Sequence, residues 1–277
     1  MDPGEILAER FPQLAARELV VIEHGWDSLV YEVDGEWIFR FPRRPEVERW
    51  IEAELALLPE LAQVLPVAVP RYELVARNGV LCAGYRKLIG EPASTGVDER
   101  TGADLGAFLT ALHGFPAERA RRLGVRSFEP PSWRDRFGEL AERFRTSVLP
   151  QLAPAERPRA EAVFAVIDEL DFQPALVHAD MGPEHVLVRE GRIAGVIDWS
   201  DARVGDPALD LAWPLNGAAR SFADGLAGEY SLDDPTRERS LFYYRLAPWY
   251  EVAYALDLES KRDVERGLAD VRARLPR

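Results

Sequence analysis

The fold of this chain is decided by the sequence VHADMGPEHVLV at residues 177–188, followed by IDW at residues 197–199. Asp180 follows a short apolar segment and lies between two of the four histidines of the chain. A carboxylate on a loop after a short strand can point into a cleft and accept a proton. An isolated Asp would be interpreted as a solvated turn residue, but the flanking histidines and the second acid, Asp198, favour a catalytic role.

Asp180, His185 and Asp198 have the spacing of a kinase catalytic loop and of the metal-binding Asp that follows it. In the kinase pattern H-x-D-x-x-x-x-N, the Asp accepts the proton of the substrate hydroxyl, the Asn reaches a metal, and a later Asp holds Mg²⁺ against the phosphates. Asp198 ends a predicted strand at residues 193–197, where a carboxylate is costly unless it is paired or metal-bound. The sequence therefore predicts Asp180 as the catalytic residue and His185 and Asp198 as metal ligands.

Histidine at position 185 is unexpected, because Mg²⁺ prefers oxygen ligands. A neutral imidazole of His185 can ligate one metal or contact it through water. The alternative for His185 is a structural hydrogen bond within the loop. His178 is predicted to brace the loop through hydrogen bonds while Asp180 does the chemistry.

The block HADMGPEHVLVREGRIAGVIDWSDARVGDPALDLAW at residues 178–213 resembles the antibiotic phosphotransferases of the aminoglycoside phosphotransferase superfamily. Their pattern is H-G-D-x-x-x-x-N/H, then I-D-W/F, then G-D-P-x-x-D-L, and Ala179 and Met181 are mild departures from it. Histidine at position 185 is similar to the aminoglycoside 2″-phosphotransferases and the macrolide 2′-phosphotransferases. The resemblance implies transfer of the γ-phosphate of GTP or ATP, with Mg²⁺, to a hydroxyl of an antibiotic, and hence antibiotic resistance. GTP is the expected donor, because the relatives with this histidine commonly use it.

The chain changes character near residue 90, from strand patterns to helical patterns. Asp34-Gly35 and Asn78-Gly79 each predict a hairpin turn, and residues 46–58 predict a helix that ends before Pro59. Ser132 is predicted to cap a helix that runs to residue 148. This order predicts an α+β, two-lobe protein-kinase-like fold, with a β-rich nucleotide-binding lobe at residues 1–88 and a mainly helical catalytic and substrate-binding lobe at residues 89–277. The strands are expected at residues 18–23, 28–33, 36–41, 71–76 and 80–87, a short β interlude at 175–198, and further helices at 98–112 and 154–170.

The N-terminal part supplies candidates for nucleotide binding. Arg40 stands where kinases have a strand Lys, and its guanidinium suits phosphates and carboxylates; the alternative is an exposed strand residue. Glu54 is the expected partner of Arg40, in preference to Glu48 and Glu52. The turn at residues 23–28 resembles a phosphate-covering loop, in which Gly25 permits close backbone approach and Ser28 can donate to a phosphate. The predicted nucleotide-binding residues are Arg40, Glu54, Ser28 and, in the crossing segment at residues 85–92, Tyr85 at the gatekeeper place and Lys87.

The acceptor side is predicted from the resemblance alone. Asp201 resembles an acidic drug-contacting position of the 2″-phosphotransferases. Residues 242–254 resemble their C-terminal helix, in which Glu251 and Trp249 are the candidates; for Trp249, core packing is an equal alternative. Acidic groups suit an aminoglycoside, because each ammonium–carboxylate bond is charge-assisted, whereas a macrolide needs a wide apolar pocket. An aminoglycoside acceptor is therefore preferred over a macrolide.

Composition is consistent with a cytoplasmic enzyme. The 277 residues carry a formal net charge of −13, which disfavours a nucleic-acid partner and attracts polycations. The single cysteine, Cys82, allows no intrachain disulfide, and neither a signal peptide nor a long apolar run is evident, so no membrane partner is expected. Three other readings stay open: a metabolite kinase of the same fold, a nucleotide-binding pseudokinase, and a metal hydrolase that uses the same acids and histidines.

Overall fold

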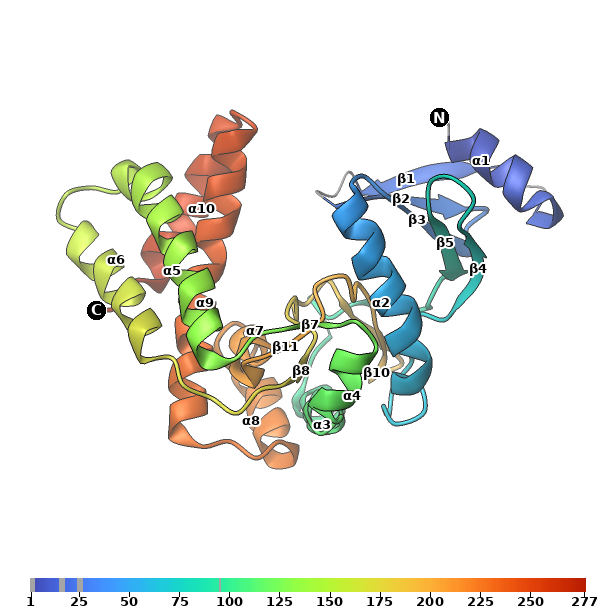
Figure 1. The fold of residues 1–277 in the computed structure, drawn as a ribbon. Helices are drawn as coiled ribbons and strands as arrows, with labels where there is room; N and C mark the ends of the chain where they lie inside the picture. Colours follow the sequence, from blue (N-terminus) through green and yellow to red (C-terminus); the bar gives the residue numbers. More distant parts are fainter. Residues whose placement is uncertain (1–2, 15–17, 24–26, 95) are drawn as a thin grey trace.

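A five-stranded antiparallel sheet forms the N-terminal part of the protein in a computed structural model, which describes residues 3–14, 18–23, 27–94 and 96–277. The strands are β1 (Leu19–Glu23), β2 (Ser28–Val33), β3 (Trp37–Pro42), β4 (Tyr72–Ala76) and β5 (Cys82–Arg86), in the order β1-β2-β3-β5-β4. Helix α1 (Pro3–Arg10) and helix α2 (Pro45–Leu61) accompany this sheet (Figure 1). Side chains alternate between the two faces of a strand, so Phe39 enters the core with residues of α1 while Arg40 points to the opposite face.

Both predicted hairpins are confirmed. β2 pairs with β3 through the turn at Asp34 and Gly35, whose φ angles of 53° and 70° are those of a type I′ turn. β4 pairs with β5, and Gly79 in their connection has a φ of 87°. The strands keep the order that the sequence predicted, with ends displaced by one or two residues.

Helix α2 is longer than predicted, because Pro59 lies inside it. A proline in the last turn removes one hydrogen bond, and the chain beyond it still closes: Ala62 N–H donates to the Leu58 carbonyl at 2.9 Å and Leu65 N–H to the Leu61 carbonyl at 2.9 Å. The prediction that the helix ends before Pro59 was therefore wrong. The extra turn adds buried Leu61 to the core.

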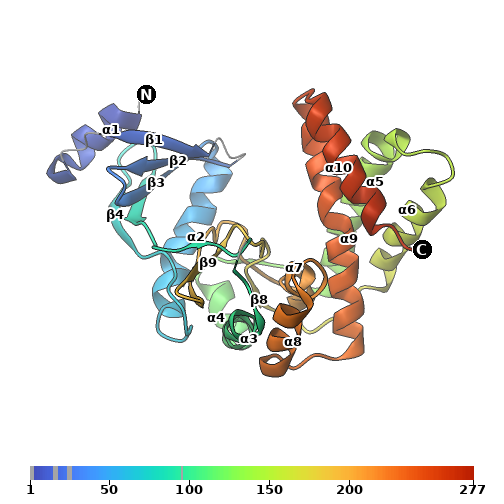
Figure 2. The same ribbon diagram turned by 180° about the vertical axis from the view of Figure 1, so that it is seen from behind.

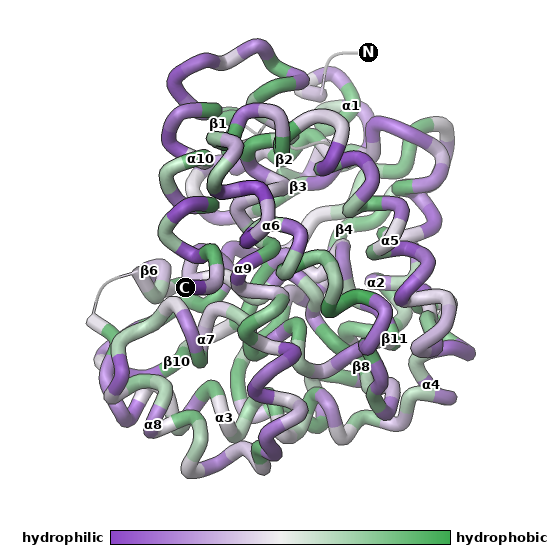
Figure 3. Tube along the Cα trace, turned by 90° about the vertical axis from the view of Figure 1, so that its left-hand side faces the viewer, coloured by the Kyte–Doolittle hydropathy of each residue, from purple (hydrophilic) through white to green (hydrophobic). Residues whose placement is uncertain are grey.

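The C-terminal part is mainly helical, with short strands between the helices (Figure 2). Its helices α5 (Pro130–Ser147), α9 (Asp234–Asp257) and α10 (Lys261–Arg274) lie across from the N-terminal sheet (Figure 1). Hydrophilic and hydrophobic residues alternate along these helices (Figure 3), as expected when one face is buried. The other elements are α3 (Glu99–His113), α4 (Ala117–Arg122), α6 (Arg157–Phe164), α7 (Ala212–Asn216), α8 (Arg220–Glu229), and the strands β6 (Glu91–Pro92), β7 (Arg126–Ser127), β8 (Ala175–Val177), β9 (Val186–Arg189), β10 (Arg192–Val196) and β11 (Arg203–Gly205).

Two helix predictions in this part need correction. Ser132 is the third residue of α5 and not its cap; its hydroxyl accepts a hydrogen bond from Glu129 N–H at 3.1 Å, and two prolines begin the helix. The helix expected at residues 154–170 is the shorter α6 followed by a 3₁₀ segment, Ala165–Glu169. In both places the sequence pattern identified the helix and misplaced its end, where cap geometry and not periodicity decides.

One hydrophobic core joins the two parts. Leu57 and Leu61 of α2 pack in the same cluster as Leu105 and Phe108 of α3 and as Trp199, which follows Asp198 directly. The boundary predicted between residues 88 and 89 falls between β5 and β6, and β6 pairs with β9 of the second part; as a division into domains it stays a prediction. Within the described residues, no helix combines the length and apolarity needed to cross a bilayer.

Candidate active site

The loop that carries Asp180 is fixed by a buried acid, Asp210. The Asp210 side chain is fully buried and accepts hydrogen bonds from His178 N–H and Ala179 N–H, both at 2.7 Å. Its Oδ2 also lies 3.1 Å from His113 Nε2 on α3. Ala179 has a φ of 68°, a conformation that disfavours residues with a Cβ, so the two hydrogen bonds hold the chain in a strained turn. Asp210 and Leu211 are the D-L of the pattern G-D-P-x-x-D-L in the sequence, but the pattern alone does not indicate this role.

His178 braces this loop, as predicted. It is buried, its Nε2 lies 2.9 Å from the Ile197 carbonyl, and its Nδ1 lies 3.3 Å from Asp180 N–H. Nε2 must donate and Nδ1 must accept, which is the hydrogen-bonding pattern of a neutral imidazole. Burial lowers the pKa of His178, in agreement with that state. The ring thus ties the backbone before Asp180 to the backbone before Asp198.

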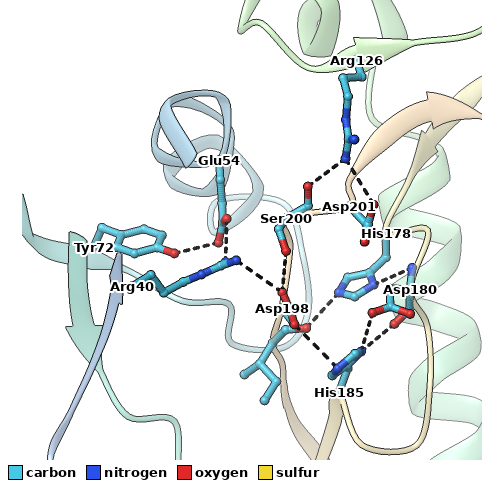
Figure 4. A network of polar contacts seen from close by, with 11 residues as sticks. Arg40, Glu54, Tyr72, Arg126, His178, Asp180, His185, Asp198, Ser200 and Asp201 are labelled. Carbon is cyan, nitrogen blue, oxygen red and sulfur yellow. Dashed lines mark hydrogen bonds and ion pairs between the residues drawn. The ribbon is translucent and has the colours of Figure 1, made fainter. Parts of the chain in front are cut away.

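Asp180, His185 and Asp198 converge as the sequence predicted (Figure 4). One ligand atom from each residue lies within 4.8 Å of the others. His185 Nδ1 lies 2.7 Å from the Asp180 carbonyl oxygen, so it donates there, and Nε2 faces Asp198 Oδ2 at 3.8 Å. Burial opposes protonation, but Asp180 and Asp198 raise the pKa of His185, so a metal must displace the proton on Nε2. The neutral ring then presents the lone pair of Nε2 toward Asp198, which is the arrangement a metal ligand needs.

The two carboxylates are in different electrostatic environments. The side chain of Asp180 is 51% exposed, and its partial desolvation by neighbouring protein atoms raises its pKa to about 6; His185 opposes the rise, and Asp201 and Asp198 add to it. Burial would also raise the pKa of Asp198, but Arg40, His185 and the Ser200 hydroxyl hold it below its ordinary value. Ser200 Oγ donates to Asp198 Oδ1 at 2.7 Å. Asp198 is thereby kept ionised, whereas Asp180 has the higher proton affinity that suits a proton acceptor.

Arg40 and Glu54 form the expected ion pair, at 3.0 Å, and both side chains are buried. Tyr72 Oη donates to the other oxygen of Glu54 at 2.9 Å. Arg40 Nη2 lies 3.7 Å from Asp198 Oδ1, so the N-terminal sheet reaches the candidate metal ligand (Figure 4). Among the described residues, Arg40 Nε and the buried Ser28 hydroxyl have no hydrogen-bond partner. Two unpaired polar groups at this place fit a polar ligand such as a phosphate.

Tyr85 and Lys87 lie on the same face of the sheet as Arg40, because Tyr85 pairs with Ile38, two residues before Arg40. The Tyr85 ring is buried and packs edge-on against Tyr72. The Lys87 ammonium pairs with Glu32 at 2.6 Å, so it is already neutralised. Glu52 pairs with Arg77, which leaves Glu54 for Arg40. Gly25 and the centre of the predicted phosphate-covering loop lie outside the described residues.

The three predicted acceptor residues differ in position. Asp201 Oδ1 is held by two arginines, by Arg126 at 3.3 Å and by Arg203. Glu251 is exposed on α9. Trp249 is fully buried against Phe164 and other core residues, so its side chain has no surface to offer a substrate, and the core-packing alternative is the correct one. The aromatic residues of α9 did not reveal which face of the helix is buried.

The site residues fit a hard divalent cation. The Asp198 carboxylate can supply oxygen ligands and Nε2 of His185 one nitrogen, and Asp180 lies within 4.8 Å of both. Mg²⁺ prefers oxygen and keeps several waters, so a site with few protein ligands suits it. A structural zinc site would instead bring together four nitrogen or sulfur ligands. The set is therefore compatible with Mg²⁺ held in part by a phosphate ligand.

The fold, with this loop and its buried Asp210 anchor, defines a kinase-like phosphotransferase. The chain belongs to the phosphotransferase enzyme family, which matches residues 18–243. It is 39% identical to viomycin phosphotransferase of Streptomyces vinaceus over 110 residues, 38% of each chain. It is 34% identical to homoserine kinase of Gluconacetobacter diazotrophicus over 158 residues, 52% of this chain and 46% of that one. The matches thus span less than two thirds of these relatives.

Solved structures share the fold over nearly the whole chain. The GDP complex of aminoglycoside 2′-phosphotransferase-IIIa superposes with a TM-score of 0.83 at 22% identity, covering 98% of this chain and 96% of that one. The macrolide 2′-phosphotransferase of Brachybacterium faecium superposes with a TM-score of 0.72 at 27% identity, covering 96% and 97%. The expected fold class is therefore confirmed, and the similarities include enzymes with different acceptors.

Proposed function

We propose that this protein transfers the γ-phosphoryl group of GTP or ATP to a hydroxyl of a small molecule. The observation that carries the proposal is the position of Asp198, which lies 3.8 Å from His185 on one side and 3.7 Å from Arg40 on the other. The candidate metal ligands and the buried Arg40–Glu54 pair thus meet at one carboxylate. Phosphoryl transfer depends on such positioning and charge stabilisation more than on covalent chemistry.

Each residue then has a defined task. Asp180 orients the acceptor hydroxyl and takes its proton as the new oxygen–phosphorus bond forms and the bond to the β-phosphate breaks, releasing the nucleoside diphosphate. Arg40, fixed by Glu54, binds phosphate oxygens, and Ser28 can donate to one of them. Asp198 and His185 would hold Mg²⁺, which when bound supplies positive charge beside the phosphates. An enzyme that consumes a nucleoside triphosphate is expected in the cytoplasm.

The identities of the acceptor and of the nucleotide donor are supported less directly than the transfer reaction itself. Among the structural neighbours, one aminoglycoside 2″-phosphotransferase was solved with GDP and kanamycin and another with ATP and streptomycin, so GTP and ATP are both candidates. An aminoglycoside is the acceptor that the sequence resemblance favours. The ion pairs of Asp201 weaken that choice, because a neutralised carboxylate attracts an ammonium poorly. The homoserine kinases among the relatives make a metabolite acceptor the second candidate.

The first test is nucleotide consumption with Mg²⁺ over a panel of acceptors: kanamycin, gentamicin, erythromycin, viomycin, L-homoserine and none, each with ATP and with GTP. Consumption stimulated by one acceptor class and abolished in Asp180→Asn supports the proposal. Nucleotide binding without acceptor-dependent consumption favours a pseudokinase. A tightly retained transition metal without nucleotide binding favours a hydrolase.

A further inference from the structure

Two arginines bind a single carboxylate, Asp201, and a third arginine lies near them. Arg126 of β7 and Arg203 of β11 are direct partners in the parallel pairing of these strands, so their side chains are neighbours. Both bind Oδ1 of Asp201, and each also donates to a carbonyl, Arg126 to Ser200 at 2.9 Å and Arg203 to Asp201 at 2.8 Å. The third arginine, Arg136 of α5, is exposed, and its guanidinium carbon lies 5.6 Å from the ring centroid of Phe128, the second residue after Arg126. Among the residues that the structure describes, Arg136 makes no ion pair.

The positive charge of this cluster exceeds its negative charge. Two guanidinium groups share one carboxylate, a third lies nearby over Phe128, and Arg203 is only 6% exposed. Burial lowers the pKa of Arg203 to about 10, and the charges of Arg126 and Arg136 lower it further against the opposing effect of Asp201. Buried like charges destabilise a fold unless a counter-charge joins them. The excess therefore fits a site whose remaining partner is an anion from outside the chain.

A neutral hydroxyl lies near the cluster. Tyr250 of α9 is 44% exposed, and partial desolvation raises the pKa of its hydroxyl to about 12, with Arg136 and Arg203 opposing the rise and Asp201 adding to it. Tyr250 therefore keeps its proton and can donate it to an anion. Arg126 is further fixed by stacking on the Trp50 ring of α2, with 4.2 Å between its guanidinium carbon and the ring centroid. Elements from both parts of the protein thus contribute to the cluster.

The cluster lies beside the reacting groups. Asp201 is close enough to Asp180 to raise its pKa. In the view of Figure 4, Arg126 and Asp201 lie with Asp180 on the side of Asp198 away from Tyr72. The groups proposed for the nucleotide, Arg40 and Ser28, belong to the N-terminal sheet. The arginine cluster is therefore placed for the acceptor and not for the nucleotide phosphates.

We infer that Arg126, Arg136 and Arg203 bind an anionic group of the acceptor, a carboxylate or a phosphate ester. This inference rests on the proposed phosphotransfer. A planar guanidinium fork matches both anions with paired hydrogen bonds. A polycationic aminoglycoside would place ammonium groups beside these guanidinium groups, of which Arg136 has no ion-pair partner among the described residues, so the cluster selects against that class. Asp201 orients Arg126 and Arg203 and does not contact the acceptor.

The test is anion binding by calorimetry, with malonate as the carboxylate probe and sulfate as the tetrahedral probe, in the presence of saturating ADP and Mg²⁺. Arg136→Gln removes one exposed cation without opening the core. Arg143→Gln is the matched control, because Arg143 lies two turns along the same helix face and its charge is already paired with Asp257. We expect Arg136→Gln to weaken the preferred probe about tenfold, as for loss of one charge-assisted bond, and Arg143→Gln to bind as wild type.

Two outcomes overturn the inference: no saturable anion binding by wild type, or equal binding by wild type and Arg136→Gln. An acceptor without an anionic group that Arg136→Gln turns over with the wild-type KM also overturns it, while leaving phosphotransfer intact. Conversely, cluster-dependent anion binding with no turnover of any acceptor would count against the proposed function alone. The comparison of malonate with sulfate identifies which anion the acceptor carries.

Discussion

Replacing Asp210 by alanine should lower both the free energy of unfolding and the catalytic activity of the protein. The change removes the acceptor of two buried N–H groups, those of His178 and Ala179, each bonded at 2.7 Å. An unsatisfied buried N–H costs about 1–3 kcal/mol, so the expected loss of unfolding free energy is about 2–6 kcal/mol. That is a large part of the ~5–15 kcal/mol that holds a typical domain together. Asp210→Asn keeps one acceptor oxygen and should lose about half as much.

The loss of activity should exceed what the loss of folded protein explains. The residue after Ala179 is Asp180, and the strained φ of 68° at Ala179 is held by Asp210. Without that anchor the loop can relax, and a displacement of about 1 Å can cost ~10²-fold in turnover. The assays are urea unfolding followed by tryptophan fluorescence and nucleotide consumption at a temperature where each variant is folded.

Asp224→Ala is the control, because Asp224 is exposed and its ion pair with Arg220 is long, 3.7 Å. Its unfolding free energy should stay within about 0.5 kcal/mol of wild type. If Asp210→Ala also stayed within that range and kept normal turnover, the anchoring role of Asp210 would be refuted.

Three further changes test neighbouring parts of the site. The protein surroundings raise the pKa of Asp180 to about 6, above its unfolded value, so ionising this residue costs stability. As pH rises through about 6, the unfolding free energy of the wild type should fall relative to that of Asp180→Asn, while the turnover of the wild type rises. The same dependence of unfolding free energy on pH in both proteins would contradict this. His185→Ala should raise the Mg²⁺ concentration needed for half-maximal activity about tenfold, and His185→Asn should restore most of it; equal Mg²⁺ requirements in all three proteins would reject a metal role. Ala179→Gly should stabilise the protein by up to about 1 kcal/mol, since glycine adopts a φ of 68° without strain, and a measured destabilisation in urea would show that the strain assigned to Ala179 is absent.

Local patterns were enough to place the reacting groups. The spacing of Asp180, His185 and Asp198 on one loop and one hairpin brings them together regardless of the rest of the chain. The Arg40–Glu54 pair also follows from local structure, because the two residues lie only 14 positions apart, on a strand and on the helix that follows it. Short-range geometry of this kind is fixed by covalent connection and regular dihedral angles, so a sequence can reveal it.

Contacts between distant segments could not be predicted in this way. Asp210 meets His113 across 97 residues, and Asp201 meets Arg126 across 75. Arg203, two residues away, is a local partner of Asp201, but nothing in the nearby sequence indicates the second partner, Arg126. For the same reason the aromatic residues of α9 did not show that Trp249 is in the core. The acceptor prediction depended on these contacts, whereas the catalytic prediction did not.

The net charge of −13 is a weak guide to the acceptor, for a physical reason. Salt screens exposed charges beyond about 8–10 Å, so the charge of the whole chain acts weakly at any one site. Near Asp180 the charges that raise its pKa are those of Asp201, Asp198 and Glu184, while Arg126 and Arg203 hold Asp201. Asp198 and His185 are committed to the proposed metal, so they add no attraction for an ammonium. The charge that an acceptor meets is therefore set by this local arrangement and not by the net charge of the chain, and the anion measurements with Arg136→Gln address that local charge directly.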